Sequence, residues 1–405
     1  MPLEIKNILD WLILGLRWVH IVAILGWIGT SLYFMWLESK LRAPSPAREL
    51  VDGEAWMGHG GGFYRMEKRR VAPGDVPRPV YWFRVEAGVT WVSGFLLLVF
   101  LYYWTGGLDL VDPEVSKISP QAAIALALVL LVFGWLIYDQ IWCSRLAVGD
   151  ARIATALSFI LLLVLAVGLC ELFTGRAAFI HVGSVLGTNM VANVWMRIIP
   201  AQEEAVAATA AGRERNAALG LRARRRAVHN TYMTLPVIFT MIANHAPSTY
   251  SHPLNWLILS LLIAVGIAVR HLMIMVDRRK LAWWAWAAAA TPLVALVGLT
   301  IPVGESTPSA AATATGDSHV SFTVVRGIVE LRCASCHSRT PSDKAFPAAP
   351  NGLSFSSPEE IAARAAIIKA STLVTRTMPP GNKTRMTEEE RALVGRWVDH
   401  GARVD

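Results

Sequence analysis

The sequence predicts an all-α protein in which a large helical membrane domain of eight spans is followed by a small helical domain. Two observations predict this division. Of the 405 residues, 54% are hydrophobic and only 17% are charged, whereas a soluble protein of this size carries about 25% charged residues. Runs of about 20 apolar residues, which are long enough to cross a bilayer, follow one another up to residue 303 and are missing after it.

Each predicted span is an apolar run bounded by polar or charged residues. The first begins without a basic segment or a small-residue cleavage site, so we interpret it as a retained span rather than a signal peptide. The sixth is the weakest, because it is short and lies between His229 and His245. The predicted spans are residues 11–37, 88–104, 121–142, 154–174, 179–199, 231–246, 255–276 and 283–303.

Basic residues are distributed very unevenly between the two sets of loops. The loops after the odd-numbered spans hold 20 lysines and arginines, whereas the opposite side offers only Lys6, Lys117 and Arg176. This is the positive-inside pattern, so we expect a bacterial inner-membrane protein with both termini and the C-terminal domain in the periplasm. The net charge of +8 is thereby explained by topology. The lipid bilayer is the expected partner of these charges, and nucleic acid is not.

A short polar segment separates the two predicted domains. Residues 304–320, "GESTPSAAATATGDSHV", are small and polar without apolar periodicity, which is typical of a flexible linker. We therefore divide the chain into a membrane domain at 1–303, this linker, and a domain at 321–405. In the last domain Ser357 and Thr387 each precede acidic residues, which is a helix-start signal.

The stretch "LRCASCHSR" at residues 331–339 contains Cys-x-x-Cys-His. This spacing is typical of covalent haem attachment, with thioether bonds from Cys333 and Cys336 and an iron bond from His337. A zinc site would need two further ligands, and no cysteine follows. We expect Met378 in "RTMPPG" as the sixth ligand rather than Met386, because two prolines stiffen its loop. The motif therefore predicts a class I cytochrome c domain with one haem c.

Ionisable side chains inside predicted spans are costly and serve as functional hypotheses. Toward the outer face, His20, His181 and His245 are candidates for holding a second, non-covalent b-type haem; the alternative is that they form hydrogen bonds between helices. Toward the inner face, Glu86 and His229 are available for proton transfer. The whole inner group comprises His59, Arg84, Glu86, Asn193, Arg197, His229, Asn230, Tyr232, Arg270 and His271.

The inner loop "GEAWMGHGGGFYR" has four glycines around His59, which allow a backbone to approach a planar group closely. A basic run, "RERNAALGLRARRRAVHN", precedes the sixth span. Together these features suit an anionic, planar, polar substrate. The alternative interpretation of the arginines is charge at the membrane surface.

Five long motifs resemble the N-terminal membrane domain of the bacterial membrane-bound urate oxidases (urate hydroxylases). That family fuses eight spans to a C-terminal cytochrome c, and "TMPPGNKTRMTEEER" is similar to its tail, so the resemblance covers nearly all of the chain. The motifs are "RWVHIVAILGWIGTSLYFMWLESKL", "GEAWMGHGGGFYRMEK", "YWFRVEAGVTWVSGF", "HVGSVLGTNMVANVWMRIIPAQ" and "HNTYMTLPVIFTMIANH".

The resemblance implies that the protein oxidises urate to 5-hydroxyisourate. Electrons would leave through the haem to a soluble cytochrome c and the respiratory chain, without formation of hydrogen peroxide. We expect Glu86 and His229 to be catalytic and His59 and Asn230 to bind substrate. One departure is Gly88 in "EAGVTW", where a bulkier residue such as tyrosine is expected.

Two further points bear on function. Urate loses two electrons whereas one c-type haem accepts them singly, which favours a second carrier in the membrane or a stabilised radical. The alternative function is a non-catalytic cytochrome subunit that relays electrons from quinol or a partner dehydrogenase. A transporter is disfavoured because the sequence shows no internal repeat.

Overall fold

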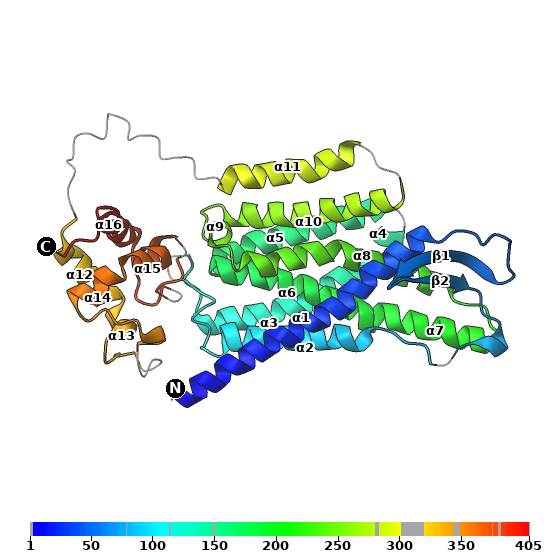
Figure 1. Cartoon of the computed structure of the whole chain (residues 1–405), viewed down its shortest axis with the longest axis horizontal. Coiled ribbons are helices and arrows are strands. Elements are labelled where there is room, and N and C mark those ends of the chain that lie inside the picture. The colour runs from blue at the N-terminus through cyan, green and yellow to red at the C-terminus, as the bar shows by residue number, and fades with distance from the viewer. Residues whose placement is uncertain are drawn as a thin grey trace.

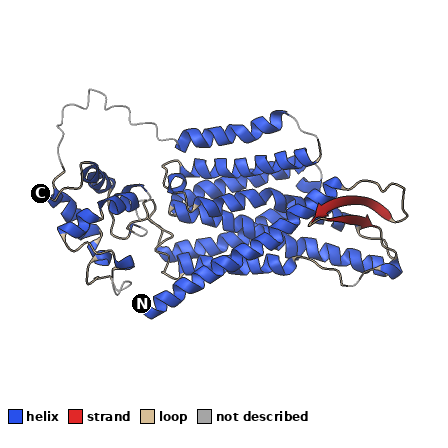
Figure 2. Ribbon diagram, in the orientation of Figure 1, coloured by secondary structure: helices blue, strands red, loops and turns tan. Residues whose placement is uncertain are grey.

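The structure, a computed structural model, is mostly helical (Figures 1 and 2). The predicted linker lies, apart from Val320, outside the residues that the structure describes. The described residues are 3–77, 79–112, 115–148, 151–279, 283–300, 320–343, 349–374, 376–379 and 382–404.

The first half of the predicted membrane domain contains four long helices and one short one. Helix α3 shows how their ends are fixed: the Ser119 side chain accepts a hydrogen bond from the Ala122 N–H at 3.2 Å, and Pro120 occupies the first helical position. The helices are α1 (Leu3–Lys40), α2 (Arg84–Leu98) with a π-helical turn (Val99–Tyr103), α3 (Pro120–Cys143), α4 (Arg145–Val148) and α5 (Ala151–Leu172).

The second half adds four long helices and two shorter ones. Helix α6 continues through a π-helical turn into α7, so this rod extends 11 residues beyond the expected span 179–199. The elements are α6 (Gly175–Asn193), the turn (Val194–Ile198), α7 (Ile199–Ala210), α8 (Ala217–Ala243), α9 (Pro247–Tyr250), α10 (Asn255–Asp277) and α11 (Trp283–Thr300).

Seven helices among the described residues are long and apolar enough to cross a membrane. They coincide with seven of the eight expected spans. The sixth expected span, residues 231–246, falls within α8, which is not among the seven. The arginine-rich first half of α8 lowers its mean hydropathy, although its second half is apolar.

Helix α6 lies at the centre of the bundle and packs against α3, α5 and α8. In the rod that it forms with α7, 67% of the most apolar stretch is buried, against 39% or less in the other six apolar helices. Glycines allow this close packing. A Cβ on Gly183 would lie 2.1 Å from the Thr240 Oγ1 of α8, and one on Gly134 of α3 would lie 2.7 Å from Val185. Small residues at helix contacts are typical of membrane bundles.

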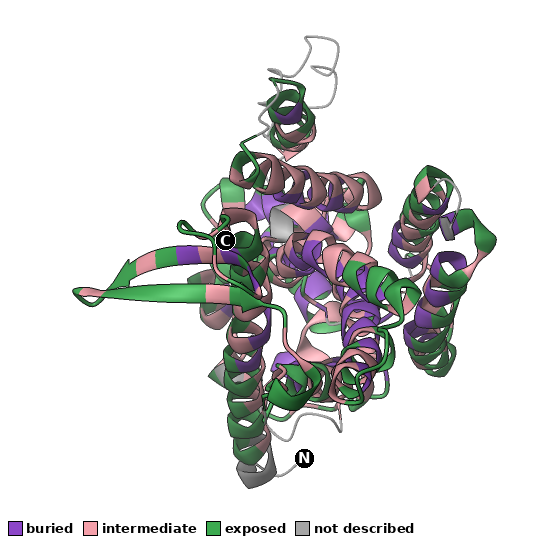
Figure 3. Cartoon of the chain, turned by 90° about the vertical axis from the view of Figure 1, so that its right-hand side faces the viewer, coloured by how far each residue is buried: buried purple, intermediate pink, exposed green. Residues whose placement is uncertain are grey.

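The segment expected as an inner loop is a β-hairpin. Strand β1 (Val51–His59) pairs antiparallel with β2 (Gly62–Arg69), and His59 is opposite Gly62. Gly60 and Gly61 form the turn at φ 58° and 78°, the left-handed conformation that a two-residue type I′ turn requires. Seen along the helices, the hairpin projects from the bundle and is largely exposed (Figure 3).

The C-terminal domain is built from short helices around a small core. Trp397, Val325, Ile361 and Met386 are each 2% exposed or less. The expected helix starts are confirmed, since Ser357 caps α14 and Thr387 forms a capping box with Glu390 in α16. The helices are α12 (Phe322–Arg332), α13 (Ala334–His337), α14 (Pro358–Ala363), α15 (Ala365–Lys369) with a π-helical turn (Ala370–Val374), and α16 (Glu388–Asp399); 3₁₀ turns occupy Pro73–Asp75 and Pro350–Gly352.

Candidate functional site

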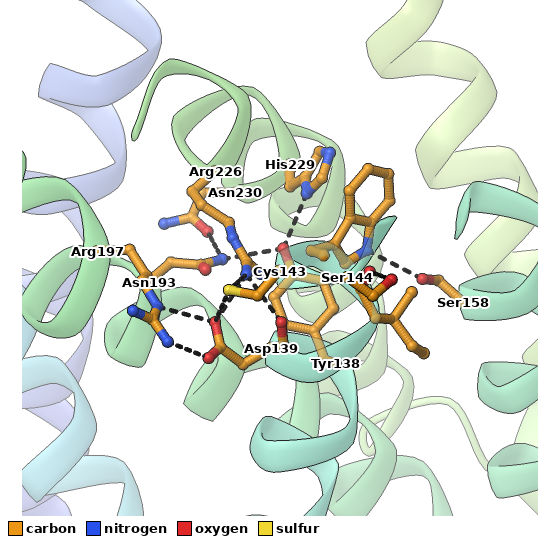
Figure 4. Close-up of polar contacts among 12 residues, drawn as sticks. Tyr138, Asp139, Cys143, Ser144, Ser158, Asn193, Arg197, Arg226, His229 and Asn230 are labelled. Atoms are coloured by element: carbon orange, nitrogen blue, oxygen red, sulfur yellow. Dashed lines mark hydrogen bonds and ion pairs between the residues drawn. The ribbon is translucent and has the colours of Figure 1, made fainter. Parts of the chain in front are cut away.

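A carboxylate between two guanidinium groups lies inside the helical bundle (Figure 4). Asp139 of α3 accepts a hydrogen bond from the Arg197 Nε at 2.9 Å, and the Arg197 Nη2 contacts its other oxygen. Arg226 of α8, only 3% exposed, donates from Nη2 to the Asp139 Oδ1 at 2.7 Å. Burying these ions is costly unless they are paired. Two guanidinium groups on one carboxylate leave the cluster with an excess of one positive charge.

A chain of hydrogen bonds runs beside this cluster and has a single consistent direction. The Met190 carbonyl can only accept, so Asn230 donates to it from Nδ2 at 2.9 Å and presents its Oδ1 to the Asn193 Nδ2 at 2.8 Å. Asn193 Nδ2 also donates to the Tyr138 hydroxyl at 3.2 Å. The Tyr138 oxygen thus accepts from Asn193, and its own proton is available to the His229 Nδ1, 2.9 Å away. With that proton donated, the neutral imidazole of His229 carries its proton on Nε2.

Three buried polar atoms in this region have no hydrogen-bond partner among the described residues. They are the Arg226 Nη1, the Asn193 Oδ1 and the Asn189 Oδ1. Asn189 and Asn193 are four residues apart on α6 and therefore share one helix face. Buried polar atoms in native proteins are nearly always hydrogen-bonded, so one donor and two acceptors indicate that a polar ligand or water binds here.

A cavity of about 750 Å³ adjoins the network, between α3, α5, α6, α8 and α10. This volume is within the range of small-molecule sites, about 300–1,000 Å³. Its walls are mostly apolar side chains. Tyr138, His229 and Asn189 line it and connect it to the network.

The structure places two of the four expected catalytic and substrate-binding residues in this network. These two residues are His229 and Asn230. Because the oxygen and the nitrogen of the Asn230 amide both form hydrogen bonds within the protein, the role of Asn230 is to orient Asn193. Glu86 lies instead at the contact of α2 with α1, with its Cγ 3.5 Å from a Cβ built on Gly26, and its buried Oε2 has no partner among the described residues. His59 is exposed beside the hairpin turn.

His20, the first of the three outer histidines, is held against α2. Its Nδ1 lies 2.9 Å from the Thr90 carbonyl and 3.0 Å from the Ser93 hydroxyl. The ring occupies the space beside Gly94, where a Cβ would be 2.8 Å from the ring. This is a hydrogen bond between helices.

The other two outer histidines have separate environments. His181 is buried, with Nδ1 2.7 Å from the Ala177 carbonyl and Nε2 3.0 Å from the Tyr103 hydroxyl, so both ring nitrogens are engaged. His245 is exposed just beyond α8. Among the described residues, no group of three or more His, Cys, Asp or Glu side chains is placed to hold a metal ion. A b-type haem at these histidines stays a prediction.

Gly88 has a structural explanation. A Cβ at this position would lie 3.4–3.8 Å from the indole of Trp195, which follows α6. The indole is therefore in van der Waals contact with the position that a side chain at residue 88 would occupy.

Sequence reasoning missed three members of the network, namely Tyr138, Asp139 and Arg226. A signal was present for Asp139, because an acidic residue inside the apolar stretch "LIYDQIW" is an ionisable group within a predicted span. Arg226 was counted only as a member of the basic run. Tyr138 carried no signal of its own, since its role depends on its neighbours in space.

The Cys-x-x-Cys-His motif begins at Cys333, directly after α12, and continues through the short helix α13. Cys333 and Cys336 are both free thiols, and burial raises the pKa of Cys333 to about 12. His337 is 8% exposed, and its Nδ1 lies 2.8 Å from the Leu353 carbonyl. This bond orients the ring and leaves Nε2 for a metal, the arrangement typical of metal-binding histidines.

The two candidate methionines differ in burial. Met386 is 1% exposed and belongs to the core of the C-terminal domain. Met378 is half-buried in the loop before α16, and its carbonyl accepts a hydrogen bond from the Arg391 Nη1 at 2.9 Å. The placement of Met386 in the core is consistent with Met378 as the expected ligand.

The fold and the network define the class of the protein: a helical protein of the membrane type, with a charged hydrogen-bonded site inside its bundle. The sequence model of the urate oxidase N-terminal family matches residues 6–301. The chain therefore belongs to the urate oxidase N-terminal family, which suggests an oxidoreductase with urate as its substrate. Searches of curated proteins and of solved structures gave no match.

Proposed function

We propose that this protein oxidises urate to 5-hydroxyisourate and passes the electrons to cytochrome c through a haem in its C-terminal domain. One observation carries the proposal, namely that a urate oxidase N-terminal domain and a Cys-x-x-Cys-His motif occur in the same chain. The first accounts for the substrate. The second supplies a route for electrons that does not need oxygen as the direct acceptor, so no peroxide forms.

The buried network supports urate as the ligand. Urate is an anion near neutral pH, with ring N–H donors and carbonyl acceptors. The excess positive charge of the Asp139 cluster favours an anion, and the Arg226 Nη1 is an unused donor for a urate carbonyl. The oxygens of Asn189 and Asn193 are unused acceptors for urate N–H groups. Asn230 orients Asn193 for this contact.

Tyr138 and His229 form the proton relay of the proposed reaction. When urate loses two electrons and water adds at C5, protons must leave the ring. Tyr138 can accept a proton on its oxygen while its own proton moves to the His229 Nδ1, 2.9 Å away. His229 then releases the proton on its Nε2 and is left as the Nδ1–H tautomer, so its proton must return to Nε2 before the next cycle.

The residues of the C-terminal motif fit a covalent haem c. Cys333 and Cys336 would form the thioethers, His337 is oriented with Nε2 free, and Met378 would be the second axial ligand. When bound, such a haem accepts and releases one electron at a time. We place this domain and both termini on the periplasmic side of the inner membrane, where a soluble cytochrome c is the acceptor.

The test is urate oxidation by the purified chain in detergent. We expect urate to disappear as added cytochrome c is reduced, with two cytochromes per urate and no peroxide. If Tyr138 and His229 move protons, His229→Gln and Tyr138→Phe should each lower kcat by about 10²-fold or more. Glu86→Gln tests whether the carboxylate at the α1–α2 contact is a second proton carrier. Glu203→Gln, at an exposed ion pair with Arg84, is the control.

Two outcomes would contradict the proposal. Peroxide formed in proportion to urate would make the protein a direct oxidase. A chain that is inert with urate but reduces cytochrome c with quinol would be the relay subunit. The Cys333→Ala, Cys336→Ala double variant should lose cytochrome c reduction while still binding urate.

A further inference from the structure

The cavity beside the network is much larger and more apolar than urate requires. It extends along α3 from Leu126 to Trp142, which corresponds to about 24 Å at 1.5 Å per residue. Most of its lining consists of leucine, isoleucine, valine and phenylalanine side chains. A small polar anion would leave most of this wall uncovered, so another kind of ligand fits the cavity better.

The opening of the cavity faces the flank of the bundle. The cavity is only partly enclosed, and Phe133 and Ile137 of α3 and Val164 of α5 line it while being 53%, 48% and 62% exposed. The mouth therefore lies between α3 and α5, on a surface of apolar side chains. A ligand dissolved in the bilayer can enter here without passing through water.

The inner end of the cavity presents a hydrogen-bond donor. When Tyr138 donates its proton to the His229 Nδ1, 2.9 Å away, the neutral imidazole carries its proton on Nε2. This N–H has no partner among the described residues, and His229 lines the cavity. Trp142 packs against the ring with centroids 4.1 Å apart and fixes its position.

We propose that this cavity binds a membrane quinone, with one ring carbonyl accepting a hydrogen bond from the His229 Nε2 and the isoprenoid tail lying between α3 and α5. A quinone combines the three required properties: a flat ring, a carbonyl acceptor and a long apolar tail. A haem fits less well, because His229 is the only histidine among the described residues that line the cavity. The proposal does not depend on urate oxidation.

Gly168 of α5 offers a substitution that fills the cavity without disturbing the fold. It lines the cavity, and a Cβ built on it meets no atom within 4 Å. Gly168→Phe should therefore place its ring in the open space, and replacing a helical glycine does not weaken the helix. Gly15→Phe is the matched control, because Gly15 of α1 also has no atom within 4 Å and does not line the cavity.

The experiment measures binding of a short-chain benzoquinone to the full chain in detergent, from the rise in Tm with ligand concentration. Organic extracts of the purified protein are analysed in parallel for quinone. We expect wild type and Gly15→Phe to bind, Gly168→Phe to lose binding, and His229→Phe to bind about tenfold more weakly through loss of one hydrogen bond.

Three results separate this inference from the proposed function. No quinone in extracts and no Tm shift, with urate turnover intact, would overturn the inference alone. Fatty acid or phospholipid extracted in place of quinone would also overturn it. Quinone binding that is lost in Gly168→Phe, in a protein inert with urate, would support the inference and contradict the proposed function.

Discussion

Asp139 sets the charge balance inside the helical bundle, and its removal has a predictable cost. Asp139→Asn keeps the shape of the side chain but leaves Arg197 and Arg226 facing each other without a carboxylate. Arg226 is 3% exposed and cannot return to water without moving α8. Removing one partner of a buried pair costs about 3–5 kcal/mol. We expect a lower temperature of aggregation in detergent, measured by size-exclusion after heating.

The ion pair of Arg84 with Glu203 provides the comparison for this prediction. Its N–O distance is 3.4 Å and both side chains are about half exposed, 46% and 51%. Exposed pairs contribute about 1 kcal/mol or less, so Glu203→Gln should leave the aggregation temperature nearly unchanged. Equal effects of the two substitutions would show that the Asp139 cluster is not a buried pair.

At the residue scale, the sequence predicted which polar side chains lie within the spans better than it predicted their partners. His229 and Asn230 were expected near the inner face and are part of the network. Asp139 was not predicted as a site residue, although its contacts with Arg197 and Arg226 form the charged cluster of the site. Glu86 and His229 were each expected to be available for proton transfer, yet α2 directs Glu86 toward α1. Which helix face meets which neighbour depends on packing, and apolar spans carry little periodicity to reveal it.

At the element scale, hydropathy predicted the positions of the long helices, whereas it did not predict the β-hairpin. Residues 51–69 contain Gly60–Gly61 between stretches with aromatic residues, which is a recognised hairpin signal. The four glycines around His59 were instead interpreted as allowing the backbone to approach a planar group or another chain. Trp56 and Phe63 on the strands are 61% and 86% exposed, so the pattern of apolar residues gave little indication of the strands.

The loop that carries Met378 is the second element with a testable role. Arg391 of α16 is 3% exposed and donates to three oxygens of this loop region: the Thr372 carbonyl, the Met378 carbonyl at 2.9 Å and the Asn382 Oδ1 at 3.3 Å. Hydrogen bonds to a charged group contribute about 1.5–3 kcal/mol each. Arg391→Lys cannot make all three contacts, so we expect weaker methionine ligation of the proposed haem.

Two measurements on the oxidised and reduced protein check this prediction. The reduction potential should fall, because a methionine ligand raises it, and the methionine–iron charge-transfer band of the oxidised protein should weaken. Arg326→Lys is the control, since Arg326 is exposed on α12 and pairs only locally with Glu330 at 2.8 Å. An unchanged band in Arg391→Lys would mean that the loop is held without Arg391, or that the ligand is another residue.

For the whole molecule, the side on which the C-terminal domain lies depends on helix α8. Seven apolar helices alone would put the two termini on opposite sides of a membrane, whereas an eighth crossing by α8 puts them on the same side. Arg226 contacts Asp139 near the C-terminal end of α3, and Thr240 lies against Gly183 in the N-terminal half of α6. The 14 residues between them rise about 21 Å, so α8 runs along its neighbours through most of their depth (Figure 1).

We therefore expect α8 to cross the membrane despite its four arginines, because all four lie in its first three turns and Arg226 is paired with Asp139. Reporter fusions after residues 60, 150, 220 and 279 should be active as cytoplasmic, and those after 112, 250 and 310 as periplasmic. The fusions at 220 and 250 decide the matter, since they flank α8. If both report the same side, α8 does not cross, and the Cys-x-x-Cys-His motif would lie on the cytoplasmic side, away from the compartment in which bacteria attach haem to it.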